Sequence, residues 1–187
     1  MNYEAVVVGV SAGGMEALSL IFSNLTRRFK LPMFIVQHMH AHSENYLSRY
    51  LNTLCPQTVK EADEKETIRN EYIYLAPANY HLLIEEDRTL SLTTDERVNY
   101  CRPAIDPLFE SAADVYREKL IGIILTGANR DGTEGMRRIK KCKGLTIVQD
   151  PKTAEAPIMP EVVMREVKVD KILKLKEIAD FLNLICR

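Results

Sequence analysis

Three polar residues of the kinds that serine hydrolases use each follow a short apolar segment of the chain. They are Ser11, His38 and Asp131, which come after the segments 5–10, 33–36 and 121–125. A serine hydroxyl can attack a carbonyl carbon, an imidazole can take up the hydroxyl proton, and a carboxylate can orient the imidazole. Geometry defines such a triad, so its order along the chain does not exclude it, although the α/β-hydrolase fold has the order Ser-Asp-His. The three residues therefore predict a hydrolytic site if folding brings them together.

The residues around Ser11 distinguish two glycine motifs. Gly9, Ser11 and Gly13 match G-x-S-x-G, which places a nucleophile on a sharp strand-to-helix turn. A dinucleotide fingerprint needs glycine at position 11 and an acidic residue near the end of the next strand, and the chain has neither. The residues leave a second interpretation open, in which Ser11 only caps the helix that follows.

The histidines raise the question of a metal site. His38, His40 and His42 alternate, and in an extended segment they would share one side, as metal ligands do. No aspartate completes an H-x-H-x-D pattern, and His81 is the only other histidine. We therefore predict no metal and no cofactor, with His40 and His42 at the surface and His38 at the end of its strand.

Asp131 has two interpretations as well. It lies in a polar loop between Gly127 and Gly132, directly before a predicted helix. An aspartate in this position often caps the helix that follows it. The alternative is the carboxylate of the triad, and the residues alone leave both open.

The apolar patterning predicts a doubly wound α/β fold. Short β-branched runs are typical of parallel strands buried on both faces, and we expect them at 5–10, 33–36, 121–125 and 145–148. Shorter strands at 72–76, 81–84 and 90–92 predict an antiparallel hairpin at an edge, since a polar turn separates the last two. Helices are expected over 14–25, 46–54, 106–119, 132–142, 161–165 and 172–185, with Ser43 and Asp106 as N-caps of the second and third. This alternation predicts a mostly parallel sheet with helices on both faces, and reactive groups at the carboxyl ends of its strands.

Composition narrows the class of protein. The 187 residues are 46% hydrophobic and 27% charged, which is the balance of one globular domain. The net charge of −1 provides no positive field, so nucleic acid and anionic lipid are not expected partners. We expect no signal peptide and no membrane insertion, because no apolar run is long enough. The four cysteines lie more than 40 residues apart without a C-x-x-C motif, which favours a reducing cytoplasmic location.

Six stretches of the chain, in one order and over nearly its whole length, resemble the catalytic domain of the chemotaxis receptor methylesterase (CheB) family. Together they are far more specific than any single motif. They are VVGVSAGG at 7–14, VQHM at 36–39, APANYH at 76–81, CRPAID at 101–106, GIILTG at 122–127 and APIMP at 156–160.

The resemblance implies a doubly wound parallel sheet and a serine hydrolase whose triad is Ser11, His38 and Asp131. It implies methyl esters of glutamate side chains on the cytoplasmic helices of chemoreceptors as substrates, and deamidation of receptor glutamines. We expect backbone N–H groups near Ala12 or Ala128 to bind the oxyanion. For Arg102 a role at the cleft and a structural salt bridge are both open. The alternative function is a catalytically weak module of the same fold that binds receptors or signalling proteins.

The chain also departs from the family pattern. Ala12 stands where threonine is common, His40 where proline is common, and Ala128-Asn129 where the family often has Met-Gly. These differences concern the acceptor cleft and leave the triad intact. We expect residues 1–187 to form one catalytic domain without the family's receiver domain, so that a receiver domain on another chain is a candidate partner. The basic residues at 137–143 form either a solvated helix face or a docking surface.

Overall fold

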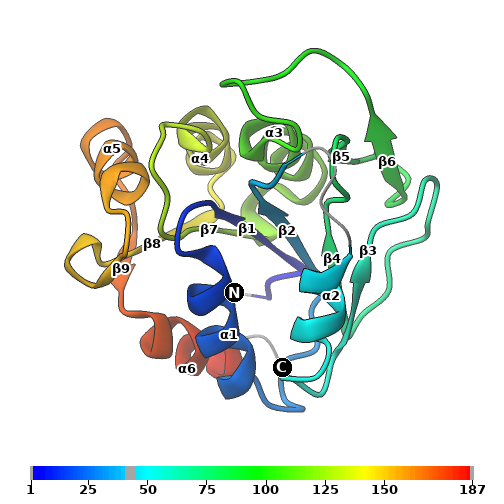
Figure 1. Ribbon diagram of the computed structural model, residues 1–187, viewed down its shortest axis with the longest axis horizontal. Helices are drawn as coiled ribbons and strands as arrows, with labels where there is room; N and C mark the ends of the chain where they lie inside the picture. Colours follow the sequence, from blue (N-terminus) through cyan, green and yellow to red (C-terminus); the bar gives the residue numbers. More distant parts are fainter. Residues whose placement is uncertain (1, 41–44, 186–187) are drawn as a thin grey trace.

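A seven-stranded parallel sheet forms the centre of the protein (Figure 1). The computed structural model describes residues 2–40 and 45–185. The strand order is β3-β4-β2-β1-β7-β8-β9. The strands are β1 (Ala5–Val10), β2 (Met33–Gln37), β3 (Thr58–Glu61), β4 (Tyr72–Leu75), β7 (Leu120–Ile124), β8 (Leu145–Gln149) and β9 (Lys171–Leu173).

The winding of the chain places the switch point of the sheet beside β1. The chain starts at β1 in the middle, continues to β2, β3 and β4 on one side, and later returns to β7, β8 and β9 on the other. Val10 pairs with Gln37, and Gly9 pairs with Ile124, so β1, β2 and β7 end at the same level. Ligands of open α/β sheets bind at this position. The residues that follow these three strands therefore meet at one edge of the sheet.

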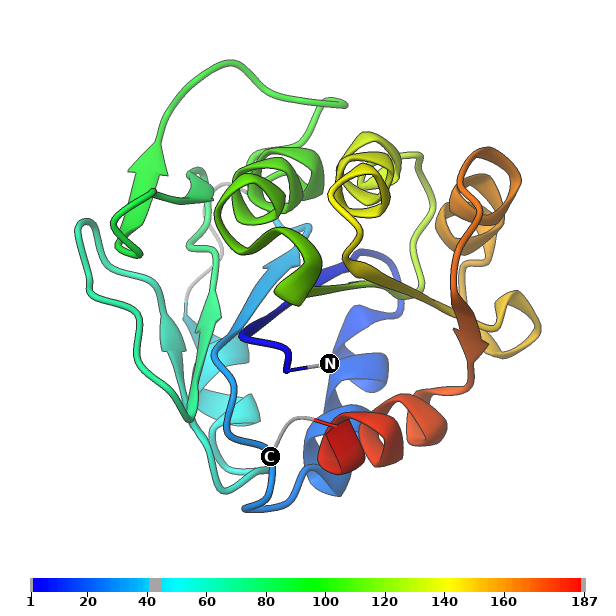
Figure 2. The ribbon, with the colours of Figure 1, turned by 180° about the vertical axis from the view of Figure 1, so that it is seen from behind.

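Helices cover both faces of the sheet, as expected for parallel strands (Figures 1 and 2). Successive residues of β1 point to opposite faces, with Val7 packed in one apolar core and Val6 and Val8 in the other. The core around Val7 is covered by α3 (Ile105–Tyr116), α4 (Thr133–Lys141) and α5 (Ile158–Glu166). The other core is covered by α1 (Gly14–Asn24), α2 (Tyr46–Leu51) and α6 (Leu175–Ile185).

The predicted hairpin is confirmed and forms a separate two-stranded antiparallel sheet of β5 (His81–Ile84) and β6 (Leu90–Thr93). It joins the segment that follows β3, since the Lys65 N–H donates to the Leu90 carbonyl at 2.8 Å. The hairpin thus lies on the β3 side of the main sheet (Figure 1).

Two strands were not predicted, and several helix ends differ. β3 and β9 are edge strands of four and three residues whose side chains are mostly half-buried or exposed. They lack the apolar runs of the central strands, and β9 occupies the first residues of the predicted last helix. The N-cap of α3 is Ala104 instead of Asp106, and the Asp106 carboxylate accepts the Gly135 N–H at 2.8 Å. Ser43 lies outside the described residues.

The basic residues of α4 make ion pairs with neighbouring elements. Arg138 donates to Asp114 at 2.8 Å, and Arg137 pairs with Glu166 at 3.2 Å. Lys140 pairs with Asp170. These contacts favour a solvated, charge-paired helix face over a docking surface.

Within residues 2–40 and 45–185, no helix combines the length and the apolar character needed to cross a membrane. The cysteines of this part, Cys55, Cys101 and Cys142, are free thiols.

Candidate active site

Ser11 lies on the sharp turn that joins β1 to α1. Its N–H donates to the Thr126 carbonyl at 2.9 Å, which ties the turn to the loop after β7. Gly13 has φ 76°, a conformation that favours glycine. Gly13 is the N-cap of α1 and no side chain caps the helix, so the interpretation of Ser11 as a cap is wrong. Among the described residues the Ser11 hydroxyl has no hydrogen-bond partner.

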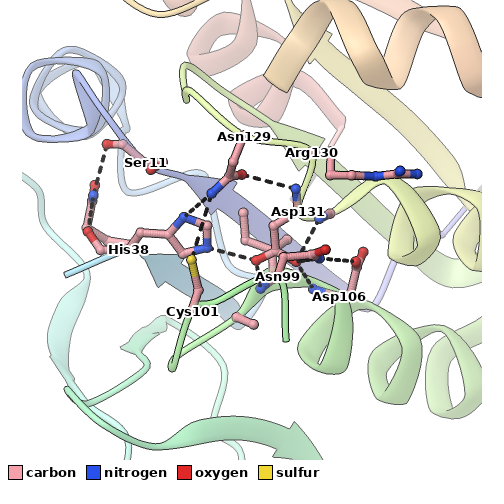
Figure 3. A network of polar contacts seen from close by, with 12 residues as sticks. Ser11, His38, Asn99, Cys101, Asp106, Asn129, Arg130 and Asp131 are labelled. Atoms are coloured by element: carbon pink, nitrogen blue, oxygen red, sulfur yellow. Dashed lines mark hydrogen bonds and ion pairs between the residues drawn. The ribbon is translucent and has the colours of Figure 1, made fainter. Parts of the chain in front are cut away.

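His38 follows β2 and faces Asp131 across the edge of the sheet. Its N–H donates to the Val10 carbonyl at 3.1 Å, which fixes its backbone beside the Ser11 turn. The ring Nε2 lies 2.7 Å from Asp131 Oδ2 (Figure 3). The other ring nitrogen, Nδ1, lies 3.2 Å from Nδ2 of Asn129. The structure thus brings His38 and Asp131 into direct contact.

The carboxylate of Asp131 is fully buried and is held by several N–H donors. Oδ2 accepts the N–H of Ile105 at 2.6 Å, and Oδ1 accepts the N–H of Asp106 at 3.2 Å. Asp131 therefore caps the N-terminus of α3. The sequence analysis considered it as a cap of the helix that follows it, α4, but the N-cap of α4 is Gly132. Asn99 Nδ2 and the Gly132 N–H also donate to Oδ1, at 3.1 and 3.0 Å. This setting stabilises a negative charge beside the imidazole.

The two groups shift each other's pKa. Burial opposes ionisation of Asp131, but the hydrogen bonds from His38 and from the Ile105 N–H hold its pKa below the usual range. Burial also disfavours the charged ring of His38. The Asp131 carboxylate and the neighbouring Cys101 side chain outweigh that effect and raise the pKa of His38 to about 9.

A second buried carboxyl, Asp106, lies behind Asp131. Asn99 Nδ2 bridges the two, at 3.2 Å from Asp106 Oδ2 and 3.1 Å from Asp131 Oδ1. Burial and the charge of Asp131 raise the pKa of Asp106 to about 7. Asp106 therefore carries a proton more readily than an ordinary aspartate, while Asp131 stays ionised.

Ser11 shares a cavity with His38 but makes no hydrogen bond to its ring. The cavity has a volume of about 850 Å³ and is lined by both residues. Many of the other lining residues are apolar, aromatic or acidic, among them Met15, Met39, Tyr46, Tyr50, Glu16 and Glu155. A smaller cavity of about 380 Å³ is also lined by His38, together with residues that include Cys101 and Arg102.

The two alanines predicted near the oxyanion lie beside the serine. Ala12 follows Ser11 directly, and Ala128 follows Gly127, where an added Cβ would lie 3.0 Å from the Ser11 Cβ. Both alanines are exposed. Within the part of the chain that the structure describes, neither of their N–H groups donates a hydrogen bond.

Arg102 lines the smaller cavity, but its guanidinium is bound within the chain. It donates to Asn79 Oδ1 at 2.9 and 3.2 Å and to the carbonyls of Thr94 and Asp95 at 2.5 and 2.9 Å. These contacts link the segments before and after the β5–β6 hairpin. They favour a structural role, through neutral oxygens instead of the salt bridge considered from the sequence.

Gln37 and three other polar residues of the site were not found by the sequence analysis. Gln37 Nε2 donates to the carbonyls of Ser11 and His38, both at 2.9 Å, and so ties the two backbones together. Its position one residue before His38 was the available signal. Asn99, Cys101 and Asn129 come from loops, where no periodicity indicates which way a side chain points.

No three His, Cys, Asp or Glu side chains of residues 2–40 and 45–185 form a cluster suited to a metal ion. His40 is exposed, and His42 lies outside the described residues.

Comparison with known proteins identifies similar chains. The CheB methylesterase family profile matches residues 6–182. A relative from Leptospira interrogans is 52% identical over 180 residues, covering 96% of this chain and 93% of its own length. The protein-glutamate methylesterase/protein-glutamine glutaminase of Clostridium acetobutylicum is 33% identical over 186 residues, and the match spans 100% of this chain but 54% of that one. The crystal structure of the Thermotoga maritima CheB methylesterase catalytic domain superposes with a TM-score of 0.94 at 32% identity, covering 99% of this chain and 100% of that one.

Proposed function

The chain belongs to the CheB methylesterase family, and on that basis we propose that it hydrolyses glutamate methyl esters on chemoreceptors with Ser11, His38 and Asp131 as its triad. The observation that carries the proposal is the contact of 2.7 Å between His38 and the buried Asp131, with His38 at the end of the strand next to that of Ser11. The chain is accordingly an enzyme of the protein-glutamate methylesterase class. A fluorophosphonate, which reacts with activated serines, tests the assignment directly.

The hydrolysis takes two steps. His38 Nδ1 takes the Ser11 proton while Oγ attacks the ester carbonyl, and the tetrahedral intermediate collapses to an acyl-enzyme and methanol. The imidazolium gives its proton to the leaving methoxide. Water then attacks the acyl carbon with the same base, which releases the glutamate carboxylate and restores Ser11. Asp131 holds the ring through Nε2 and stabilises the imidazolium.

The oxyanion of the intermediate needs hydrogen-bond donors close to Ser11. The N–H groups of Ala12 and Ala128 suit this task, because they flank the serine and have no acceptor among the described residues. Donors already in place stabilise the developing charge without reorganisation.

The raised pKa of His38 predicts a pH dependence. A base works only when unprotonated, and with a pKa of about 9 only about one ring in a hundred is neutral at pH 7. We expect kcat/KM for ester hydrolysis to rise about tenfold per pH unit from pH 7 and to level off near pH 9. Initial rates of methanol release between pH 6 and 10 measure this. A plateau already reached at pH 7 would contradict the prediction.

We also propose glutamine deamidation, which two features favour. The names of several relatives include protein-glutamine glutaminase, and the same acyl-enzyme chemistry applies to an amide. Ammonia is then the leaving group, and an amide is the poorer substrate. We expect slow ammonia release from a receptor that carries glutamine, measured with a coupled assay, and none from a Ser11→Ala variant. Equal release by both proteins would exclude the activity.

The alternative is a module of this fold that binds receptors without turnover. It predicts no reaction of Ser11 with a fluorophosphonate probe. The proposed enzyme predicts labelling at Ser11 only, lost in Ser11→Ala, and peptide mass spectrometry identifies the labelled residue.

The chain spans about half the length of several curated relatives, for example 54% of the Clostridium acetobutylicum protein. We propose that the substrates are the cytoplasmic helices of chemoreceptors and that the protein is located in the cytoplasm. We further propose, as the second point, that a receiver domain on another chain regulates it. Pull-down with phosphorylated and unphosphorylated receiver domains tests the second.

A further inference from the structure

The side-chain amide of Asn129 connects the two members of the His38–Asp131 pair. Its Oδ1 accepts the backbone N–H of Asp131 at 3.0 Å, and its Nδ2 lies 3.2 Å from Nδ1 of His38 (Figure 3). The same Nδ2 lies 3.8 Å from the sulfur of Cys101. A backbone N–H can only donate, so the amide oxygen must face Asp131 and the NH₂ must face the ring.

This orientation identifies the tautomer of His38. The NH₂ of Asn129 can only donate, so Nδ1 accepts and carries the lone pair of the neutral ring. The ring proton is therefore on Nε2, where it is donated to Asp131 Oδ2. Because Nε2 is hydrogen-bonded to Asp131, Nδ1 is the atom that has to receive the Ser11 proton. Asn129 donates a hydrogen bond to that same atom.

We propose that Asn129 is a positioning residue for the hydrolysis. It holds the neutral His38 ring in its Nε2-protonated form and donates a hydrogen bond to Nδ1 until the Ser11 hydroxyl takes the place of the Asn129 amide. The inference rests on the proposed function, since the contact matters when His38 is the base for Ser11. One lone pair accepts one strong hydrogen bond, so Asn129 and Ser11 compete for it. A ring protonated at Nδ1 cannot accept from Asn129, so the contact belongs to the neutral ring alone.

The competition predicts a particular pH profile for Asn129→Ala. At pH 6 both proteins start from a protonated ring without the contact, and they react with a fluorophosphonate at equal rates. Near pH 10 the native protein must first give up the contact, so the variant reacts about fivefold faster, which corresponds to one net hydrogen bond. The midpoint of the pH–rate profile of Asn129→Ala lies about 0.7 pH unit above that of the native protein, which is the logarithm of the same factor.

Other titratable groups surround His38 and are common to both proteins. Asp131 and Cys101 influence its ring directly, and Asp106 lies behind Asp131. The charged or titratable groups of the two cavities beside the ring are Glu16, Glu155, His40, Arg97 and Arg102, together with three tyrosines. A difference between the native protein and the Asn129→Ala variant therefore reports the effect of Asn129. Repeating the same comparison in a Cys101→Ala background tests whether the thiol contributes to the difference.

Arg130→Ala is the matched control. Arg130 is the next residue of the same loop, and its exposed side chain pairs with Glu166, at 3.6 Å, away from the His38 ring. We expect it to keep the native profile. An Asn129→Ala profile that is equal to or below the native one at every pH, or the same gain in Arg130→Ala, would overturn the proposal.

Nitrogen-15 NMR of labelled histidine decides the proposal without turnover. We expect the proton of the neutral His38 ring on Nε2 in the native protein, and a ring pKa about 0.7 unit higher in Asn129→Ala. A proton on Nδ1, or an unchanged ring pKa, would overturn it. Failure of the proposed function looks different, because the native protein would then show no labelling at Ser11, whereas the NMR measurement would still report the His38 ring.

Discussion

Replacement of Ser11 by alanine is expected to reduce methanol release from a methylated chemoreceptor to the background rate. The Ser11 hydroxyl lies at the carboxyl end of β1, has no hydrogen-bond partner among the described residues, and lines the same cavity as the His38 base. Without it no acyl-enzyme forms, and in a serine protease the loss of the nucleophile costs about a million-fold in turnover. Gas-chromatographic detection of methanol from methyl-labelled receptor measures the effect.

Ser19 supplies the control for this experiment. It lines the same cavity, but its hydroxyl is bound to the Met15 carbonyl at 2.6 Å within α1. We expect Ser19→Ala to retain methanol release within a few-fold of the native rate. Native activity in Ser11→Ala would exclude Ser11 as the nucleophile and, with it, the proposed triad.

The second large effect is expected for Asp131→Asn. Three N–H groups donate to Oδ1 of Asp131 and only that of Ile105 donates to Oδ2. An amide at this position therefore keeps more hydrogen bonds with its oxygen toward the three donors, which leaves its NH₂ facing His38 and the Ile105 N–H. The ring must then accept at Nε2 and carry its proton on Nδ1, the atom that has to act as the base. In serine proteases the corresponding change lowers turnover by about ten-thousand-fold, and we expect a loss of that order. Methanol release by the variant, with its thermal unfolding recorded in parallel, measures the loss.

Asp106→Asn is the matched control for Asp131→Asn. Asp106 is also buried and lies in the first turn of α3, but it does not contact the ring of His38. We expect this variant to lose far less activity, because the tautomer of His38 does not depend on it. Equal losses in the two variants would assign the effect to disturbance of α3 and would contradict the role of Asp131.

The central part of the fold followed from local patterns. The strands β1, β2, β7 and β8 are almost wholly buried, so most of their residues are apolar and many are β-branched. These apolar runs made the four strands predictable from the sequence. The edge strands β3 and β9 bury only part of their side chains and have no such pattern. Their position became known only from the neighbours with which they pair.

Local sequence also indicated where the polar groups of the site leave the sheet. The carboxyl ends of parallel strands lie at one edge, so residues that follow three central strands had to come close together. The structure places His38 and Asp131 in contact and places Ser11 at the end of the neighbouring strand. The variants Ser11→Ala and Asp131→Asn test the proposed role of these three residues as a triad.

The partners of each polar group came from the packing of distant segments, which no local pattern records. Asp131 caps α3, which begins 26 residues before it, instead of the helix that follows it. The amides of Gln37, at the end of β2, and of Asn99 and Asn129, in loops, orient the site through contacts between distant segments. Apolar periodicity reports which face of an element is buried, so the chain alone indicated the sheet and its reactive edge. Hydrogen bonds depend on direction and on distances of about 3 Å, and those were set only once the loops had packed against one another.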